Sequence, residues 1–243
     1  MYPRLTQTAI LAGGLGTRLR PVYDSGPKCM APVAGRPFLE HLIARLTNQG
    51  FREIILCVGY CRDLIVEYFG DGAQFDAQIS YSIEHAPLGT AGALRNAAGQ
   101  FNAETLLVLN GDSLIEMNYR ELLEAHTQRR ARITMSVIQS RGARYGFVEF
   151  DSEFAITQFK EKEPFDSDVL RTTRFMNAGV YVISRAVLNE IPEGIAVSIE
   201  KEVFPAQIGY GFFVHPVTGY FIDIGVPEDF HRAEEEIKER TRK

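Results

Sequence analysis

The 243-residue sequence has few cysteines, no long apolar run and no excess of basic residues. Its three cysteines, Cys29, Cys57 and Cys61, are odd in number and show no disulfide framework. Cys57 and Cys61 lie close together but have no further Cys or His pair nearby, which argues against a zinc site. We therefore expect reduced thiols in a cytoplasmic protein.

Segments for membrane insertion or export are also missing from the sequence. No apolar run approaches the roughly 18 residues of a membrane-spanning helix, and the N-terminal M-Y-P-R-L-T-Q lacks the apolar region of a signal peptide. The net charge of −5 argues against general nucleic-acid binding. Any phosphate-binding surface must then be a local patch of Arg and Lys, and we expect neither membranes nor nucleic acids as partners.

The first half of the chain alternates between strand-like and helix-like segments. Hydrophobic content of 45% and charged content of 23% are ordinary for a globular protein, and the length suits one α/β domain. Strands are predicted at 9–12, 53–58, 79–83 and 105–109, and helices at 37–49, 62–69, 90–100 and 118–129. This order predicts a Rossmann-like, mostly parallel sheet with helices on both faces.

The pattern changes after residue 131. Strands are predicted at 133–138, 146–150, 154–159, 177–183, 212–216 and 220–222, with helices near 185–190, 199–206 and 227–240. We expect these segments to add mixed and antiparallel strands to a single domain spanning 1–243. The stretch 165–174 is the most loop-like and is predicted to be a mobile flap.

A glycine-rich turn follows the first predicted strand. Gly13, Gly14 and Gly16 allow backbone N–H groups to line a concave turn that suits phosphate oxygens, and the cations Arg18 and Lys28 flank it. The turn is not a P-loop, because no register supplies G-x-x-x-x-G-K-[ST]. A simple strand-ending turn is the alternative, but the two cations favour a phosphate-binding loop.

Two further polar turns are predicted at the same edge of the sheet. Ligands of open α/β sheets bind beyond the carboxyl ends of the strands. Glu84, Gly89 and Thr90 follow the strand at 79–83, and the segment 110–112 follows the strand at 105–109. Convergence of three glycine-bearing turns predicts one ligand site.

Two aspartates are candidate metal ligands. Asp112 follows an apolar strand through Gly111, and Asp223 ends the aromatic strand at 220–222, again next to a glycine. Carboxylate oxygens suit Mg²⁺. The alternative is that both are turn or capping residues, since Asn, Gly and Asp all favour turns.

The second half offers weaker candidates. Glu161 and Lys162 end the strand at 154–159, but a Lys-Glu-Lys-Glu run is normally a solvated charged face, and the spacing alone favours that interpretation. Two glycine-bearing segments, 145–146 and 177–179, either present backbone N–H groups to a ligand or simply begin strands.

These residues together resemble a known family, the sugar-1-phosphate nucleotidyltransferases, over nearly the whole chain. The family motif A-G-G-x-G-T-R-L-x-P followed by Pro-Lys stands at 12–21 and 27–28, and it is very specific. P-L-G-T-A-G-A, N-G-D, Glu161-Lys162, N-A-G-V-Y and D-I-G-V-P-E-D follow in the family's order. Cys29 stands where the family usually has proline, and Glu163 separates Lys162 from Pro164 where E-K-P is commoner.

The resemblance implies a role for each matched position. Residues implied to hold the nucleotide are Leu11, Ala12, Gly13, Gly14, Gly16, Thr17, Glu84, Gly89, Thr90, Asn110 and Gly111. Those implied to be catalytic are Arg18, Lys28, Asp112 and Lys162, with Asp112 and Asp223 as Mg²⁺ ligands. The sugar phosphate is assigned to Tyr145, Gly146, Glu161, Lys162, Asn177 and Gly179. Residues 1–130 are expected to form a nucleotide-binding half and 131–243 a sugar-phosphate-binding half, without a left-handed β-helix domain.

The implied reaction joins a sugar 1-phosphate to a nucleoside triphosphate and releases pyrophosphate. An ionised Glu84 suits the two adjacent donors of guanine, which favours GTP over UTP. The sequence is most similar to short bacterial guanylyltransferases for D-glycero-α-D-manno-heptose 1-phosphate. Mannose-1-phosphate guanylyltransferases and sugar-1-phosphate uridylyltransferases are the alternatives.

Two proteins of other classes share some of these features. A GT-A glycosyltransferase normally carries D-x-D for its metal, whereas this strand end has N-G-D-S with one carboxylate. A non-catalytic nucleotide-sugar sensor would not need Arg18, Lys28, Asp112 and Asp223 together. Apolar faces in the second half could pair subunits, so a homo-oligomer is a further expectation.

Overall fold

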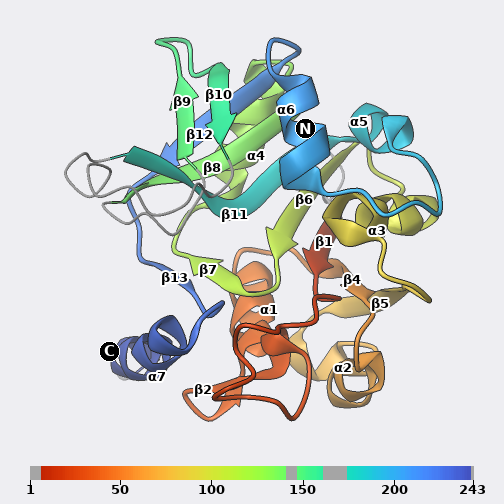
Figure 1. The fold of residues 1–243 in the computed structure, drawn as a ribbon, viewed down its shortest axis with the longest axis vertical. Helices are drawn as coiled ribbons and strands as arrows, with labels where there is room; N and C mark the ends of the chain where they lie inside the picture. Colours follow the sequence, from red (N-terminus) through yellow and green to blue (C-terminus); the bar gives the residue numbers. More distant parts are fainter. Residues whose placement is uncertain (1–6, 141–146, 161–173, 242–243) are drawn as a thin grey trace.

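A nine-stranded mixed sheet runs through the centre of the molecule (Figure 1). The computed structural model describes residues 7–140, 147–160 and 174–241. Along the main path the strands lie in the order β10-β9-β11-β6-β1-β4-β5, and β8 pairs with both β11 and β12. The predicted mixed, mostly parallel sheet is confirmed.

Four neighbouring strands of the first half are parallel to one another. They are β1 (Thr8–Leu11), β4 (Glu53–Val58), β5 (Gln78–Ile83) and β6 (Thr105–Asn110). Strand β1 lies between β4 and β6, with Thr8 opposite Ile54 on one side and Leu107 on the other. Because an interior strand is covered on both faces, its central residues are continuously apolar, as in the buried L-L-V-L at 106–109 of β6.

The second half adds strands of both directions. They are β8 (Ile133–Ser140), β9 (Phe147–Phe150), β10 (Ile156–Lys160), β11 (Arg174–Ser184) and β12 (Phe212–Val217). The long strand β11 is antiparallel to β6, β8 and β9, so it joins the second-half strands to the parallel core.

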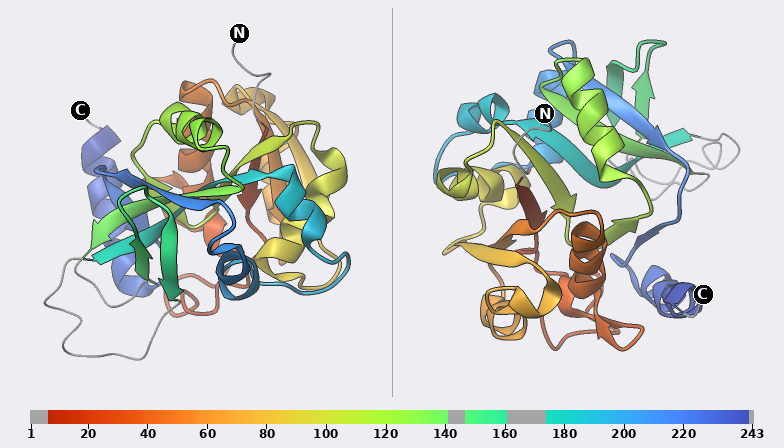
Figure 2. Two further views of the ribbon diagram at one scale, coloured as in Figure 1. Left: turned by 90° about the horizontal axis from the view of Figure 1, so that it is seen from above. Right: turned by 180° about the vertical axis from the view of Figure 1, so that it is seen from behind.

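Helices cover both faces of the sheet, as predicted. They are α1 (Phe38–Asn48), α2 (Arg62–Phe69), α3 (Gly89–Ala97), α4 (Tyr119–Gln128), α5 (Arg185–Glu190), α6 (Phe204–Gln207) and α7 (Pro227–Thr241). Short 3₁₀ turns lie at Lys28–Met30, Ala73–Phe75 and Ala98–Gln100, and a π-helical turn lies at Ile199–Val203. Figure 2 shows α3 (yellow) and α5 (cyan) side by side on one face of the sheet.

Alternate residues of the interior strands supply two separate hydrophobic cores. Leu107 and Leu109 of β6 pack in the core beneath α1 and α7, whereas Leu106 and Val108 pack in the core beneath α3 and α5. Successive side chains of a strand point to opposite faces, so one apolar strand serves both cores. In the described part of the chain, no helix has the length and apolar character needed to cross a membrane.

Three short strands were not predicted: β2 (Pro32–Val33), β3 (Arg36–Pro37) and β7 (Ser113–Ile115). The last pairs with β13 (Phe221–Asp223) in a two-stranded sheet separate from the large one. The sequence predicted β13 as a strand but did not indicate its partner. In that pairing Asp223 lies opposite Ser113, next to Asp112.

Candidate functional site

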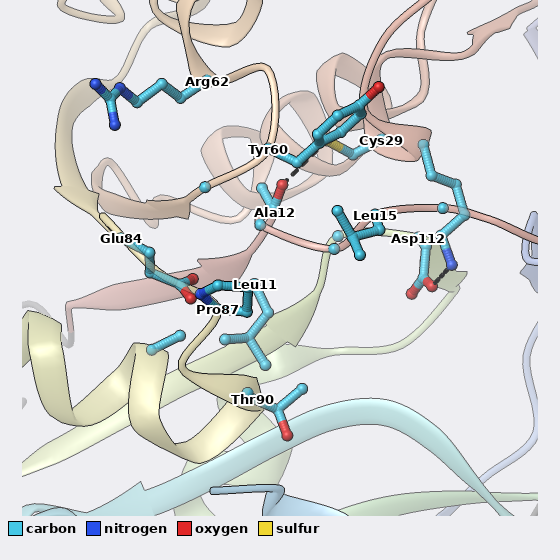
Figure 3. Close-up of a pocket in the computed structure, with 18 of the residues that line it drawn as sticks. Leu11, Ala12, Leu15, Cys29, Tyr60, Arg62, Glu84, Pro87, Thr90 and Asp112 are labelled. Carbon is cyan, nitrogen blue, oxygen red and sulfur yellow. Dashed lines mark hydrogen bonds and ion pairs between the residues drawn. The ribbon is translucent and has the colours of Figure 1, made fainter. Parts of the chain in front are cut away.

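A pocket of about 600 Å³ opens at the carboxyl ends of β1, β4, β5 and β6. The strand order brings together turns that are up to a hundred residues apart in the chain. Figure 3 shows Glu84 and Asp112 on opposite sides of this pocket, with Leu11 and Thr90 between them. The predicted site residues that line it are Leu11, Ala12, Gly13, Gly14, Gly16, Lys28, Glu84, Gly89, Thr90, Asn110, Gly111 and Asp112.

Close packing leaves little room for a side chain at two positions of the pocket wall, against a side chain at Gly13 and against backbone at Gly111. A Cβ on Gly13 would lie 2.7 Å from Glu84 Oε1, and a Cβ on Gly111 would lie 2.6 Å from the carbonyl oxygen of Leu11. The Gly111 N–H donates to that same carbonyl at 3.0 Å. Gly14 differs, because a Cβ added there would have nothing within 4 Å. Its backbone therefore borders open space in which a ligand can approach closely.

Charged side chains gather at the Asp112 side of the pocket. The Lys28 ammonium forms an ion pair with Asp112. The Ser113 hydroxyl oxygen lies 3.2 Å from both Asp112 Oδ1 and Asp223 Oδ2, so it bridges the two carboxylates. We call Lys28, Asp112, Ser113 and Asp223 the acid–base cluster. Asp223 reaches Ser113 and Asp112 only because β13 pairs with β7.

The two aspartates of the acid–base cluster have pKa values shifted in opposite directions. Burial, and then the Asp112 carboxylate, raise the pKa of Asp223 to about 6. Burial also works against the charged form of Asp112, but the Lys28 ammonium, together with hydrogen bonds from Ser113 and the backbone, holds the pKa of Asp112 below its ordinary value. Burial works against the Lys28 ammonium too, while Asp112 and Asp223 raise its pKa overall. Neighbouring charges thus keep Asp112 and Lys28 ionised.

This donor set fits a magnesium ion that completes its shell with phosphate and water. Asp112 and Asp223 are two hard oxygen donors whose mutual repulsion a cation would relieve. Among the described residues no group of three or more His, Cys, Asp or Glu side chains could hold a metal. Magnesium commonly uses only one or two protein carboxylates together with substrate phosphates.

Glu84 stands at the other side of the pocket with fewer partners. Its Oε2 accepts a hydrogen bond from the Leu88 N–H at 3.0 Å. Burial raises the pKa of Glu84 above its ordinary value, although the Leu88 N–H favours the charged form. Glu84 thus has spare acceptor capacity toward the pocket.

Several predicted residues do not line this pocket. Thr17, Arg18, Asp223, Asn177 and Gly179 lie outside its wall. The exposed Arg18 reaches toward the Asp223 turn, where its Nη2 would lie 3.8 Å from a Cβ placed on Gly225. Tyr145, Gly146, Glu161 and Lys162 fall outside the described residues, as does 165–173 of the predicted flap.

Asn177 and Gly179 belong to a network behind the pocket wall. The Asn177 side-chain amide donates to the hydroxyl of the buried Tyr181 at 2.7 Å, and its carbonyl accepts the Gly179 N–H at 2.9 Å. Asn110, which does line the pocket, donates to the same hydroxyl at 3.5 Å. The network therefore connects β11 to the pocket floor through Tyr181.

Sequence patterns missed part of the pocket wall, including Tyr60, Arg62 and Glu200. Glu200 comes from the π-helical turn more than a hundred residues after Thr90, and its I-E-K-E-V context is that of an ordinary charged helix. Only tertiary packing brings it to the site, so no local pattern could have identified it.

All three cysteines are free, in agreement with the absence of a disulfide framework. Cys29 lines the pocket but is buried, and burial raises its pKa to about 12. A thiol with so high a pKa does not act as a nucleophile near neutral pH. The chemistry of the site therefore belongs to its carboxylates and cations.

Comparison with known proteins identifies the family. The chain is 39% identical to mannose-1-phosphate guanylyltransferase of Mycobacterium tuberculosis, covering 98% of this chain and 66%, just under two thirds, of that protein. It is 34% identical to D-glycero-alpha-D-manno-heptose 1-phosphate guanylyltransferase of Aneurinibacillus thermoaerophilus, covering 96% of this chain and 98% of that protein.

Solved structures agree with the sequence relatives. The crystal structure of HddC from Yersinia pseudotuberculosis complexed with GMP-PN has a TM-score of 0.84 and 32% identity, covering 96% of this chain and all of that one. A putative glucose-1-phosphate thymidylyltransferase from Bacillus anthracis, at 20% identity and a TM-score of 0.83, shares the fold. The family described as nucleotidyl transferase matches residues 7–240. The chain therefore belongs to the nucleotidyl transferase family.

Proposed function

We propose that this protein is a sugar-1-phosphate guanylyltransferase, which transfers GMP from GTP to a sugar 1-phosphate and releases pyrophosphate. The observation that carries the proposal is the pocket itself, with a lone carboxylate at one side and the acid–base cluster beside a glycine turn at the other. A nucleoside triphosphate matches this arrangement, because its base lies at one end and its negatively charged phosphates lie at the other. The names of the relatives support the same reaction.

Glu84 is the proposed guanine-binding residue. Guanine presents N1–H and the N2 amino group side by side, and an ionised carboxylate accepts both. Uracil and thymine present one donor flanked by acceptors, which a carboxylate repels. Guanine would also stabilise the ionised form of Glu84, whose pKa is raised by burial.

The proposed mechanism needs no general base. The attacking group is a phosphate oxygen that is largely ionised near neutral pH, because its second pKa is about 6. Catalysis then consists of holding the two phosphates in line and neutralising the charge that develops on the leaving pyrophosphate. Lys28 and Arg18 are the proposed cations for the triphosphate, and backbone N–H groups of the glycine turn orient it. A Mg²⁺ held by Asp112 and Asp223 would supply further positive charge at the phosphate oxygens.

The acceptor is assigned to the second half of the chain. Residues 1–130 form the proposed nucleotide-binding half and 131–243 the sugar-phosphate-binding half, with Lys162 at the sugar phosphate and Tyr145, Gly146, Glu161, Asn177 and Gly179 around the sugar. We favour D-glycero-α-D-manno-heptose 1-phosphate, because two relatives named for that substrate match this chain along 97–98% of their own length. Mannose 1-phosphate is the second candidate, favoured by the 39% identity to the M. tuberculosis protein.

The experiment that tests the proposal is pyrophosphate release over a matrix of four nucleoside triphosphates and a panel of sugar 1-phosphates, with Mg²⁺. We expect the highest kcat/KM for GTP with the heptose 1-phosphate. Release with mannose 1-phosphate alone would select the second candidate. Tight binding of GTP without Mg²⁺-dependent release would contradict the enzyme and favour a nucleotide sensor.

A further inference from the structure

Glu200 lines the pocket, and hydrogen bonds to one of its two carboxylate oxygens hold the side chain in place. Its Oε2 accepts hydrogen bonds from the Thr90 hydroxyl at 2.9 Å and from the Ser198 hydroxyl at 3.1 Å. The Thr90 oxygen in turn accepts the backbone N–H of Ile199 at 2.8 Å. Each hydroxyl has a single hydrogen, so both are already used to position this carboxylate.

The segment that carries Glu200 is clamped onto the start of α3. The Val197 carbonyl accepts from the N–H groups of Ala91 at 3.0 Å and Gly92 at 3.3 Å, and the Val197 N–H donates to Leu88 at 2.8 Å. A Cβ on Gly89 would lie only 2.5 Å from the Val197 oxygen. Two N–H groups in the first turn of α3 are thus satisfied by the Val197 carbonyl, and the clamp fixes the position of the carboxylate.

The other carboxylate oxygen of Glu200 is left for a ligand. Within the described ranges, no hydrogen-bond donor contacts Oε1, although Glu200 lines the pocket and is only partly exposed. On the same pocket floor, the buried Oδ1 of Asn110 has no hydrogen-bond partner either. The pocket wall thus holds two acceptor oxygens to which no described protein group donates, and a ligand that brings hydroxyl or amide hydrogens can bond to them.

The place of Glu200 indicates which ligand group supplies them. Its anchor Thr90 lies between the base side at Glu84 and the phosphate side at Asp112 (Figure 3). In a nucleotide the ribose lies between base and phosphates, and it carries two neighbouring hydroxyl groups. A carboxylate repels phosphate oxygens but accepts hydrogen bonds from hydroxyls, and charged acceptors form the stronger bonds.

We infer that Glu200 is a ribose-binding residue, whose free carboxylate oxygen accepts a hydrogen bond from a ribose hydroxyl of the bound nucleotide. This inference rests on the proposed guanylyltransferase function, because that function sets the direction of the nucleotide in the pocket. It gives the enzyme a contact that distinguishes ribonucleotides from deoxyribonucleotides.

The test is the dissociation constant of GTP with Mg²⁺, measured by calorimetry without sugar phosphate so that no turnover occurs. We expect Glu200→Gln to weaken GTP binding about five- to tenfold, the difference between a charged and a neutral hydrogen bond. With 2′,3′-dideoxy-GTP the same substitution should change binding less than twofold. The 2′-deoxy and 3′-deoxy nucleotides then identify the hydroxyl.

The matched control is Glu202→Gln on the same π-helical turn. Glu202 is exposed, is absent from the pocket wall and caps the turn by accepting the Ser198 N–H at 2.8 Å, which a glutamine carbonyl also accepts. We expect unchanged GTP binding in this variant. Melting temperatures of both variants separate loss of a contact from loss of the fold.

The direction of the change in GTP affinity distinguishes a ribose contact from the alternative that Glu200 only contributes negative charge to the pocket. If Glu200 does not contact the ribose, removing its negative charge should tighten binding of the anionic triphosphate. Tighter or equal GTP binding by Glu200→Gln would overturn the inference, as would a loss that persists with dideoxy-GTP. Failure of the unmodified protein to bind GTP would instead overturn the proposed function.

Discussion

Two polar clusters in this protein show how differently a fold treats ionisable groups. The acid–base cluster at the pocket contains three ionisable groups, because Lys28 pairs with Asp112 and the Ser113 hydroxyl bridges Asp112 and Asp223. The second cluster lies beneath α4, where His126 is 4% exposed and makes hydrogen bonds with Thr134 at 3.0 Å and Ser184 at 3.3 Å. Both clusters connect segments that are distant in the sequence, but only the first connects them through charged side chains.

The pKa values separate the two clusters. At the pocket, Lys28 and Asp112 hold each other ionised, while the pKa of Asp223 is raised to about 6. Beneath α4, burial lowers the pKa of His126 to about 4, so the ring stays neutral at physiological pH. Opposed shifts among neighbours are typical of sites that handle charge, whereas a neutral, fully bonded imidazole is typical of structure.

We expect the largest effect on activity from a substitution that disrupts the acid–base cluster at the pocket. Asp112→Asn removes the charge that pairs with Lys28 and a proposed metal ligand, so we expect kcat for pyrophosphate release to fall about 1000-fold. Asp76→Asn is the control, because Asp76 forms an ion pair with Arg52 at 2.6 Å on the surface, where its side chain is 70% exposed. That variant should keep full activity. Activity within tenfold of the unmodified protein in Asp112→Asn would contradict a functional role.

The second prediction concerns the cluster beneath α4. The unfolded chain binds a proton at His126 below pH about 6.5, while the folded protein does so only below about 4. Stability is therefore lost as pH falls through this window, by about 3 kcal/mol in total. Urea unfolding of His126→Gln between pH 7 and 4.5 should show a shallower loss than that of the unmodified protein.

The control for His126 is the same substitution at His231, which is exposed on α7. We expect His231→Gln to keep the pH dependence of the unmodified protein. Parallel pH profiles for His126→Gln and the unmodified protein would show that the His126 cluster does not resist protonation. Neither histidine lines the pocket, so kcat at pH 7.5 should stay unchanged in both variants.

We expect the smallest effect from replacing Glu84, which lies on the side of the pocket opposite the acid–base cluster. Glu84 is a partly buried carboxylate without a cationic partner in the described structure, so its replacement should alter selectivity rather than catalysis. We expect Glu84→Gln to lower the GTP:UTP ratio of kcat/KM about tenfold, equivalent to about 1.4 kcal/mol. An unchanged ratio would refute the proposed contact with guanine. Glu67→Gln, on the exposed face of α2, is a matched control.

Much of the fold could be predicted from local patterns. The strand at 53–58 and the helix at 62–69 have the predicted bounds, because apolar β-branched runs and helical spacing act over a few residues. The resemblance to sugar-1-phosphate nucleotidyltransferases is confirmed by the family match. The small β7–β13 sheet could not be predicted, since three-residue strands carry no periodic signal.

The sequence by itself determined which turns end at the ligand edge. Parallel strands of a βα repeat place their carboxyl ends together, so glycine turns after β1, β5 and β6 had to converge whatever the details of packing. Glycine at position 111 likewise indicates a place where two backbones approach closely.

Only the tertiary structure decided which charges meet. Asp223 reaches Asp112 through the pairing of β13 with β7, and Glu200 reaches Thr90 through the clamp of residues 195–200 on α3. Pairing of short segments across more than a hundred residues depends on the packed core, because the few local hydrogen bonds do not offset the entropy of closing so long a loop. The carboxylates that surround the pocket are therefore a property of the fold.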